Sequence, residues 1–154
     1  MSRAEDRLAA LGLRLPSVAA PVAAYLPAVR SGSLVFTSGQ LPLVEGALSA
    51  TGKVGADLDE ATARDLAATC ALNGLAAVKS VIGDLDLVER IVKVVGYVAS
   101  APGFTGQATV VNGASDLLGE VFGDSGRHAR SAVGMAVLPM DAPVEVEIIV
   151  EVAG

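Results

Sequence analysis

The chain of 154 residues has few of the residues that build metal sites and disulfides. It contains one cysteine, Cys70, one histidine, His128, and no tryptophan. A zinc site needs several nitrogen or sulfur ligands and a disulfide needs two thiols, so the sequence predicts neither within the chain. Glycine-rich phosphate-binding loops of the dinucleotide or Walker type are also absent. The sequence therefore predicts chemistry without a metal and without a cofactor.

Basic residues are scarce as well. Lysine and arginine total 11 against 17 acidic residues, which gives a net charge of −6. Proteins that bind nucleic acid use a basic surface to displace counterions from phosphates, so nucleic acid is not an expected partner. The uncharged stretch 94–115 is interrupted by Pro102, glycines and polar residues, which argues against a membrane-spanning helix. Together with the single thiol, these features predict a cytoplasmic protein that does not bind membranes.

Aliphatic side chains, in contrast, are abundant. Hydrophobic residues make up 52% of the sequence but aromatic residues only 3%, so a core of Val, Leu, Ile and Ala is expected. The length is near the commonest domain size, and no internal repeat divides the chain. We predict a single domain over residues 1–154, with a short helical extension over about residues 1–20. Ser2 and Glu5 match a capping box at the start of this extension.

The order of the predicted elements is typical of an α+β fold. Pro27 marks the first strand as an edge strand. Asp57 and Glu60 match a capping box for the first long helix, and Gly83 and Gly123 follow the two long helices as stop signals. The predicted ranges are strands 25–30 and 34–38, a loop over 45–57, helix 58–82, strand 88–99, helix 107–122, and a closing pair of strands, 130–138 and 144–152.

These elements predict a mixed sheet with both long helices packed on one face. The two strands before the first long helix are expected to form a hairpin. The face of the sheet that the helices leave uncovered is too apolar to lie in water, given the composition. Self-association is the expected solution.

Two charged residues near the end of the chain are candidates for chemistry. Arg130 lies where a basic segment enters an apolar strand, and its guanidinium can hold a carboxylate with two parallel hydrogen bonds. Glu145 belongs to a strand in which Val or Ile alternates with Glu, and it can activate water as a general base. An ordinary salt bridge for Arg130 and a solvated carboxylate for Glu145 fit the pattern equally well. His128 is interpreted as a structural or surface residue, and Cys70 as a buried one.

The expected register keeps Arg130 and Glu145 apart within one chain. If the closing strands form a hairpin that turns at Asp141, Glu145 lies opposite Val137 and Arg130 lies opposite Val152. Seven residues of strand then separate their levels, roughly 24 Å at ~3.4 Å per residue, and their side chains lie on opposite faces. A site that uses both residues must therefore lie between subunits.

Two segments resemble the signatures of a known family. Residues 36–42 read FTSGQLP, and residues 129–133 read ARSAV before the strand that carries Glu145. Both resemble signatures of the reactive-intermediate deaminase family, RidA/YjgF, also called the endoribonuclease L-PSP family. Tyr25 resembles the tyrosine that follows the N-terminal leader of that family. The resemblance runs from about residue 22 to the end of the chain.

The resemblance implies a chorismate-mutase-like α+β fold and a barrel-like homotrimer with three sites between subunits. It also implies hydrolysis of 2-imino or enamine acids, such as 2-iminopropanoate or 2-iminobutanoate, to 2-keto acids and ammonia. By position, Arg130 would bind the substrate carboxylate and Glu145 would position or activate the water. The further pocket residues that the resemblance implies are Tyr25, Ser38, Gly39, the backbone of Ala132, and Asn112 as the nearest counterpart of the family's pocket asparagine.

The sequence departs from the family pattern and leaves other functions open. Ala132 stands where many members have cysteine, so a side-chain role at this position is lost. The alternative function is a trimeric protein that uses Arg130 to bind a keto acid or a similar carboxylate without turnover. Ribonuclease activity, which one family name suggests, is disfavoured by the acidic charge and the lack of a basic patch with aromatic residues. Retention of both Arg130 and Glu145 favours catalysis over binding alone.

Overall fold

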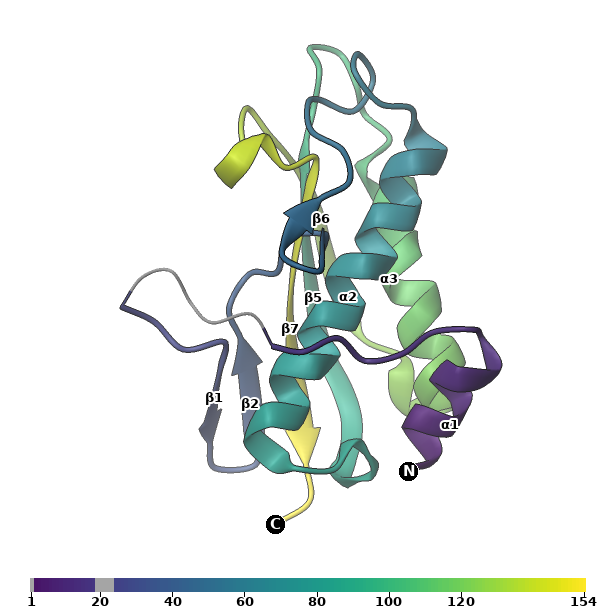
Figure 1. The fold of residues 1–154 in the computed structure, drawn as a ribbon, viewed down its shortest axis with the longest axis vertical. Helices are drawn as coiled ribbons and strands as arrows, with labels where there is room; N and C mark the ends of the chain where they lie inside the picture. Colours follow the sequence, from purple (N-terminus) through teal and green to yellow (C-terminus); the bar gives the residue numbers. More distant parts are fainter. Residues whose placement is uncertain (1, 19–23) are drawn as a thin grey trace.

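A five-stranded sheet with two long helices on one face makes up most of the molecule (Figure 1). The computed structural model describes residues 2–18 and 24–154; the end of the predicted N-terminal extension, residues 19 and 20, lies outside this part. The helices are α1 (Arg3–Ala10), α2 (Glu60–Ile82) and α3 (Gln107–Phe122), with short 3-10 turns η1 (Leu85–Leu87), η2 (Gly123–Gly126) and η3 (Pro139–Asp141). The strands are β1 (Ala28–Ser31), β2 (Leu34–Thr37), β3 (Leu43–Val44), β4 (Ala47–Leu48), β5 (Val88–Ala99), β6 (Ala129–Met135) and β7 (Val144–Val152). The predicted α+β class is confirmed.

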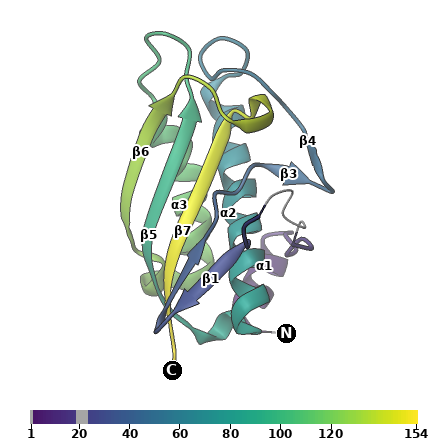
Figure 2. The ribbon, with the colours of Figure 1, turned by 90° about the vertical axis from the view of Figure 1, so that its left-hand side faces the viewer.

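The sheet has the strand order β1-β2-β7-β5-β6 (Figure 2). β5 and β6 are parallel, and all other neighbours are antiparallel. The predicted hairpin of strands 130–138 and 144–152 is therefore wrong, because β5 lies between β6 and β7. Helix α3 joins β5 to β6 as the crossover that parallel strands require. The alternation of residue types along a strand predicts which face each side chain takes, but it does not identify the neighbouring strand.

The N-terminal half contains one hairpin that was expected and one that was not. β1 and β2 form the expected hairpin, and β1 is an edge strand, as Pro27 indicated. The predicted loop 45–57 contains β4, which pairs with β3 in a second, small hairpin. Glu45 and Gly46, between these strands, have φ angles of 51° and 81°. Left-handed values at both central residues are what a tight two-residue hairpin turn requires.

Helix α2 begins later than the sequence pattern suggests. Its N-cap is Asp59, whose carboxylate accepts a hydrogen bond from the backbone N–H of Thr62 at 2.7 Å. The predicted capping box at Asp57 is wrong, because Asp57 instead accepts a hydrogen bond from the backbone N–H of Lys53 at 2.9 Å. The competition is local: two aspartates lie two residues apart, and the earlier one stabilises the preceding turn.

The other predicted helix ends are confirmed. Ser2 and Glu5 form the capping box of α1. Gly83 follows α2 and Gly123 follows α3, with φ angles of 85° and 61° that favour glycine at a helix end. Strand β5 and helix α3 have the predicted ranges, 88–99 and 107–122.

One continuous aliphatic core lies between the sheet and the long helices. Five side chains of β7 are buried on this side: Val144, Val146, Ile148, Val150 and Val152. Gly96 of β5 lies directly under Val111 of α3, and Gly113 of α3 lies against the backbone of Arg64 in α2. These two glycines let α3 approach both the sheet and α2. By length and composition α2 could cross a membrane, but half of its most apolar stretch is buried inside the protein, which is typical of a core helix.

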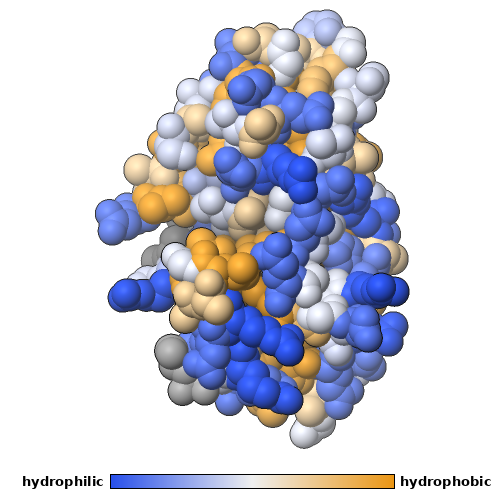
Figure 3. All heavy atoms as spheres, turned by 90° about the vertical axis from the view of Figure 1, so that its right-hand side faces the viewer, coloured by the Kyte–Doolittle hydropathy of each residue, from blue (hydrophilic) through white to orange (hydrophobic). Residues whose placement is uncertain are grey.

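The opposite face of the sheet, here called the open sheet face, is defined by the exposed residues Val29, Phe36, Val133 and Met135 together with Glu145 and Glu147. The helices lie behind the sheet when this face is viewed (Figure 2). Its four apolar side chains are 37–50% exposed. Glu145 and Glu147 alternate with the buried residues of β7 and so lie on this face. The outer face of the helical layer is instead largely hydrophilic around smaller apolar patches (Figure 3).

Candidate functional site

Arg130 lies on β6, at the edge of the sheet, and its side chain reaches α3 on the helical side. Its Nη1 donates to Asn112 Oδ1 at 2.7 Å and to Ser115 Oγ at 3.2 Å. Its Nη2 donates to the backbone oxygen of Ala108 at 3.2 Å. Residues 108, 112 and 115 lie on one stripe of the helix, because their spacings of four and three residues match its turns. Asn112 and Arg130, both among the predicted site residues, are thus joined by a hydrogen bond.

The surroundings of Arg130 leave its positive charge uncompensated. All three acceptors are neutral, and the ion pairs of the described residues do not include Arg130. A guanidinium has five N–H groups, so the three hydrogen bonds leave the Nε–H and one Nη2–H without an acceptor among the described residues. Every other arginine of the chain is exposed, whereas Arg130 is partly buried. Such a cation can bind an anionic ligand side-on through two parallel hydrogen bonds.

The acceptor Ser115 is itself bound to His128. The Oγ of Ser115 lies 2.8 Å from His128 Nε2, and His128 Nδ1 lies 2.7 Å from the backbone oxygen of Gly126. Sequence reasoning missed both Ser115 and the role of His128 beside it. A signal was present, since position 115 continues the stripe of Asn112 and faces the strand that begins just after His128.

Glu145 lies on the open sheet face, beside the signature residues of the N-terminal half. Its carboxylate packs against Gly39, where an added Cβ would come within 1.9 Å of Oε1. Burial raises the pKa of Glu145, and the neighbouring carboxylate of Glu147 raises it further. Glu147 accepts a hydrogen bond from the hydroxyl of Tyr97 at 2.8 Å. Burial, followed by this hydrogen bond, raises the pKa of Tyr97 to about 12.

The remaining predicted pocket residues divide between the two faces. Ser38 precedes Gly39, and its hydroxyl donates to the backbone oxygen of Leu26 at 2.6 Å, which ties the segment after Tyr25 to the end of β2. Tyr25 is 52% exposed. Ala132 lies on the helical side, two residues after Arg130, and packs against the core. The structure therefore brings Gly39 to Glu145, and Asn112 to Arg130.

Arg130 and Glu145 do not meet within the chain. Arg130 is level with Val94 of β5, and Glu145 is level with Tyr97 on the other side of that strand. Three residues of strand separate the two levels, roughly 10 Å at ~3.4 Å per residue, instead of the seven that the predicted hairpin required. The side chains lie on opposite faces, as expected, because an odd offset reverses the face.

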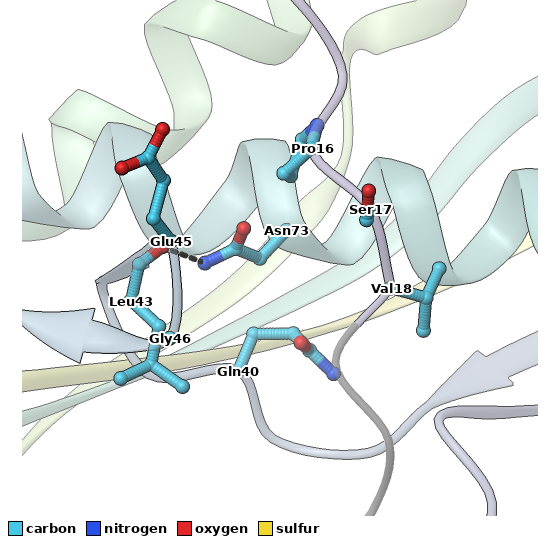
Figure 4. A pocket seen from close by; sticks show the side chains of 8 residues that line it. All are labelled: Pro16, Ser17, Val18, Gln40, Leu43, Glu45, Gly46 and Asn73. Atoms are coloured by element: carbon cyan, nitrogen blue, oxygen red, sulfur yellow. Dashed lines mark hydrogen bonds between the residues drawn. The ribbon is translucent and has the colours of Figure 1, made fainter.

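A separate hollow of about 430 Å³ lies between the segment after α1, the β3–β4 hairpin and α2 (Figure 4). It contains none of the predicted site residues: its lining is Pro16, Ser17, Val18, Gln40, Leu43, Glu45, Gly46 and Asn73. The amide nitrogen of Asn73 donates to the backbone oxygens of Leu41 and Leu43, both at 3.0 Å. We therefore assign its amide donor to fixing the hairpin and do not place the candidate site here.

No cluster of three or more His, Cys, Asp or Glu residues that could hold a metal occurs within residues 2–18 and 24–154. Cys70 is fully buried in α2, and burial raises the pKa of its thiol well above the ordinary value. A buried thiol of this kind is chemically inert. The groups left for chemistry are Arg130 with its neutral acceptors and Glu145 with its raised pKa.

The sheet order, the two helices on one face and the exposed second face define a small α+β protein with the chorismate-mutase-like fold. The chain belongs to the family described as "YjgF/chorismate_mutase-like, putative endoribonuclease", whose family model matches residues 5–152. The membership that residues 36–42 and 129–133 indicated is thereby confirmed.

Relatives cover nearly the whole chain. Protein TCP17 of Trypanosoma cruzi is 45% identical over 150 residues, which are 97% of this chain and 94% of that protein. The crystal structure of Atu1372 from Agrobacterium tumefaciens, a protein of unknown function, has 48% identity and a TM-score of 0.93 over 98% of this chain and 93% of that one. The structure of E. coli TdcF with bound serine has 25% identity and a TM-score of 0.65 over 89% and 94%.

Proposed function

We propose that this protein hydrolyses reactive 2-imino and enamine acids to 2-keto acids and ammonia, in a cleft between subunits of a cytoplasmic homotrimer. The observation that carries the proposal is the environment of Arg130. A partly buried guanidinium is held by three neutral acceptors and keeps two N–H groups for a ligand. A carboxylate is the group that matches this charge and geometry.

The carboxylate of a 2-imino acid places its reactive carbon one bond from the anchored group. The imine carbon is already electrophilic, so orientation and one proton-transfer group can supply catalysis without a metal. Glu145 is the candidate for that group, because burial and the neighbouring Glu147 raise its pKa, which makes its carboxylate a stronger base.

The reaction needs one water molecule and conserves every proton. The water oxygen forms a bond to the imine carbon while the Glu145 carboxylate accepts a proton from that water. The π electrons of the C=N bond move to the nitrogen, and Glu145 returns the proton there, which gives the neutral amino alcohol. Glu145 then transfers the hydroxyl proton to the nitrogen, the carbon–nitrogen bond breaks, ammonia leaves and the keto group forms. Arg130 binds the carboxylate throughout and takes no part in the bond changes.

Opposite faces of one sheet cannot present Arg130 and Glu145 to the same small substrate. We therefore assign the two residues of each cleft to different subunits, with the open sheet face turned toward the neighbours. Its exposed apolar residues supply surface for such contacts. Ser38 and Gly39 would line the cleft beside Glu145, Asn112 and the backbone of Ala132 would lie on the Arg130 side, and Tyr25 would close it from a neighbouring chain.

Binding without turnover is the second candidate. The structure of E. coli TdcF contains bound serine, a small molecule with a carboxylate, and an Arg130 anchor alone would account for such binding. Ribonuclease activity, which the family description includes, is disfavoured because the chain carries a net charge of −6 and few aromatic residues.

The test couples an amino-acid oxidase, which supplies the 2-imino acid, to this protein and measures the rate of keto-acid release. Wild-type protein is expected to accelerate release over buffer, while Arg130→Ala and Glu145→Gln lose the acceleration. Arg127→Ala removes a positive charge from an exposed position, and Glu151→Gln removes a negative charge from the strand that carries Glu145. Both variants are matched controls and should retain activity.

Each outcome separates the alternatives. Absence of acceleration by the wild type, combined with binding of pyruvate that Arg130→Ala abolishes, would favour the binding protein. Unchanged turnover in Arg130→Ala would overturn the assigned site. A monomeric mass by light scattering would overturn the shared cleft.

A further inference from the structure

Three polar groups follow one another from Arg130 into the protein. Arg130 Nη1 donates to Ser115 Oγ at 3.2 Å, Ser115 Oγ lies 2.8 Å from His128 Nε2, and His128 Nδ1 lies 2.7 Å from the backbone oxygen of Gly126. Of the residues in this series, the proposed reaction uses only Arg130. Ser115 and His128 have no role in it so far, although both are partly buried beside the anchor.

The backbone oxygen of Gly126, the last acceptor, sets the direction of each hydrogen bond in this series. A backbone oxygen only accepts, so Nδ1 of His128 carries the proton that it donates to Gly126. In the neutral ring Nε2 is then an acceptor, and the hydroxyl of Ser115 donates to it. The lone pairs of Ser115 are left to receive the N–H of Arg130. All three hydrogen bonds are satisfied at once, with no competing donor.

The Gly126 end of the hydrogen-bond series packs closely against α3. Gly126 is buried, and a Cβ added there would lie 2.4 Å from the backbone oxygen of Leu118 in α3. The turn that ends at Gly126 is thus in close contact with α3, and the backbone oxygen that accepts the hydrogen bond from His128 belongs to this packed turn. The hydrogen bonds therefore link a closely packed part of the backbone to the guanidinium.

We propose that Ser115 and His128 are positioning residues that fix the rotation of the Arg130 guanidinium, so that its remaining Nε–H and Nη2–H face the carboxylate of a 2-keto or 2-imino acid. For the class of ligand, this rests on the proposed function. Asn112 and Ala108 accept from Nη1 and Nη2, and Ser115 adds the second acceptor at Nη1. With both hydrogens of Nη1 taken, the plane of the guanidinium is defined.

The first experiment measures pyruvate binding by calorimetry to the full chain and to Ser115→Ala, His128→Phe and the double variant. Ser115→Ala is expected to weaken binding about tenfold, toward the lower end of what one hydrogen bond to a charged group contributes. The double variant should bind like Ser115→Ala, because His128 acts through Ser115. In the coupled assay, KM should rise by a similar factor with kcat nearly unchanged, since the anchor binds substrate and transition state alike. Thr109→Ala, on the exposed side of α3, is the control.

The second experiment needs no ligand. Nitrogen-15 NMR of the arginine side chains, with Arg130 assigned from the signals missing in Arg130→Ala, reports rotation of the guanidinium. Separate Nη signals are expected in the wild type, and averaged signals in Ser115→Ala and His128→Phe.

The outcomes distinguish this inference from the function on which it rests. Failure of wild-type protein to accelerate keto-acid release and to bind pyruvate, with the NMR difference present, would overturn the proposed function and support the positioning role. Unchanged Arg130 signals and unchanged affinity in Ser115→Ala would overturn the positioning role. Losses that add in the double variant would show that the two residues act separately, which also overturns it.

Discussion

The two faces of the sheet are built from the same strands but have opposite relations to water. On the helical side, β7 buries a continuous row of Val and Ile against α2 and α3. On the open sheet face, the same strand presents Glu145 and Glu147 among the exposed apolar residues Phe36 and Val133. One face is completed within the chain, whereas the other has apolar and acidic groups that a single chain leaves in solvent.

This difference shows how stability and chemistry are divided. The aliphatic face contributes the free energy of folding, because burial of apolar area is the dominant favourable term. The open sheet face contains Glu145, whose pKa is raised, and the exposed apolar side chains that we propose for self-association. Substitutions on the two faces should therefore change different measured quantities.

The largest expected effect comes from two neighbouring isoleucines of β7 that point to opposite faces. Ile148→Ala should lower the free energy of unfolding by about 3 kcal/mol, because Ile148 is fully buried and its truncation leaves a cavity. Ile149→Ala, on the open side, should cost less than about 1 kcal/mol in the isolated chain. Urea unfolding at one low protein concentration compares them, since association would add stability. Equal losses would contradict the division between the faces.

Association should respond to a charge on the open sheet face. Phe36→Asp is expected to weaken self-association on the order of a hundredfold, because a carboxylate loses its hydration when the face is covered. Val81→Asp is the control: Val81 is 38% exposed, close to the 41% of Phe36, but lies on α2. Light scattering over a dilution series gives the mass of each variant. A drop in mass for Val81→Asp alone would place the interface on the helical side.

Close packing on the covered side can be tested at two glycines of α3. Gly113→Ala should cost about 2 kcal/mol, because the added Cβ would meet the backbone oxygen of Arg64 and force the helices apart. Gly119→Ala has open space around the new Cβ and should stabilise the protein by roughly 0.5–1 kcal/mol, the helix-propensity difference. In both thermal and urea unfolding, the stability of Gly113→Ala should fall and that of Gly119→Ala should rise.

The smallest expected effect is electrostatic. In the proposed reaction the deprotonated Glu145 is the base, so activity should fall as the pH drops through its pKa. Glu147→Gln removes a charge that raises this pKa, so the acidic limb of the kcat/KM profile should move to lower pH by a fraction of a unit. Glu151→Gln, farther along the same face, should leave the limb in place. A shift to higher pH in Glu147→Gln would contradict the assignment of Glu145.

Local signals in the sequence predicted the ranges of the helices and strands well, but they did not predict which strands pair in the sheet. Helix 107–122 and strand 88–99 were predictable because apolar periodicity and a following glycine are local properties. The position of β5 between β6 and β7 was not predictable in this way, because parallel pairing depends on where α3 packs. Arg130 and Glu145 lie on opposite faces, as predicted, although their strands both pair with β5 and not with each other.

The candidate site was predictable where a residue type suggests chemistry by itself. Arg130 and Glu145 were found as charges in apolar strands, and Asn112 as the nearest counterpart of the family's pocket asparagine. Ser115 and the role of His128 were not found, because a serine in a helix and a single histidine gain meaning only when the fold places them beside Arg130.

The position of Arg130 also affects how the exposed edge of the sheet can pair with other strands. β6 is the last strand of the sheet, so its outer edge presents backbone groups with which another strand could pair. A charge that points inward from an edge strand resists such pairing, because a strand added at the edge would bury the charge further. The arginine that we propose as the ligand anchor is therefore also expected to hinder aggregation through this exposed edge.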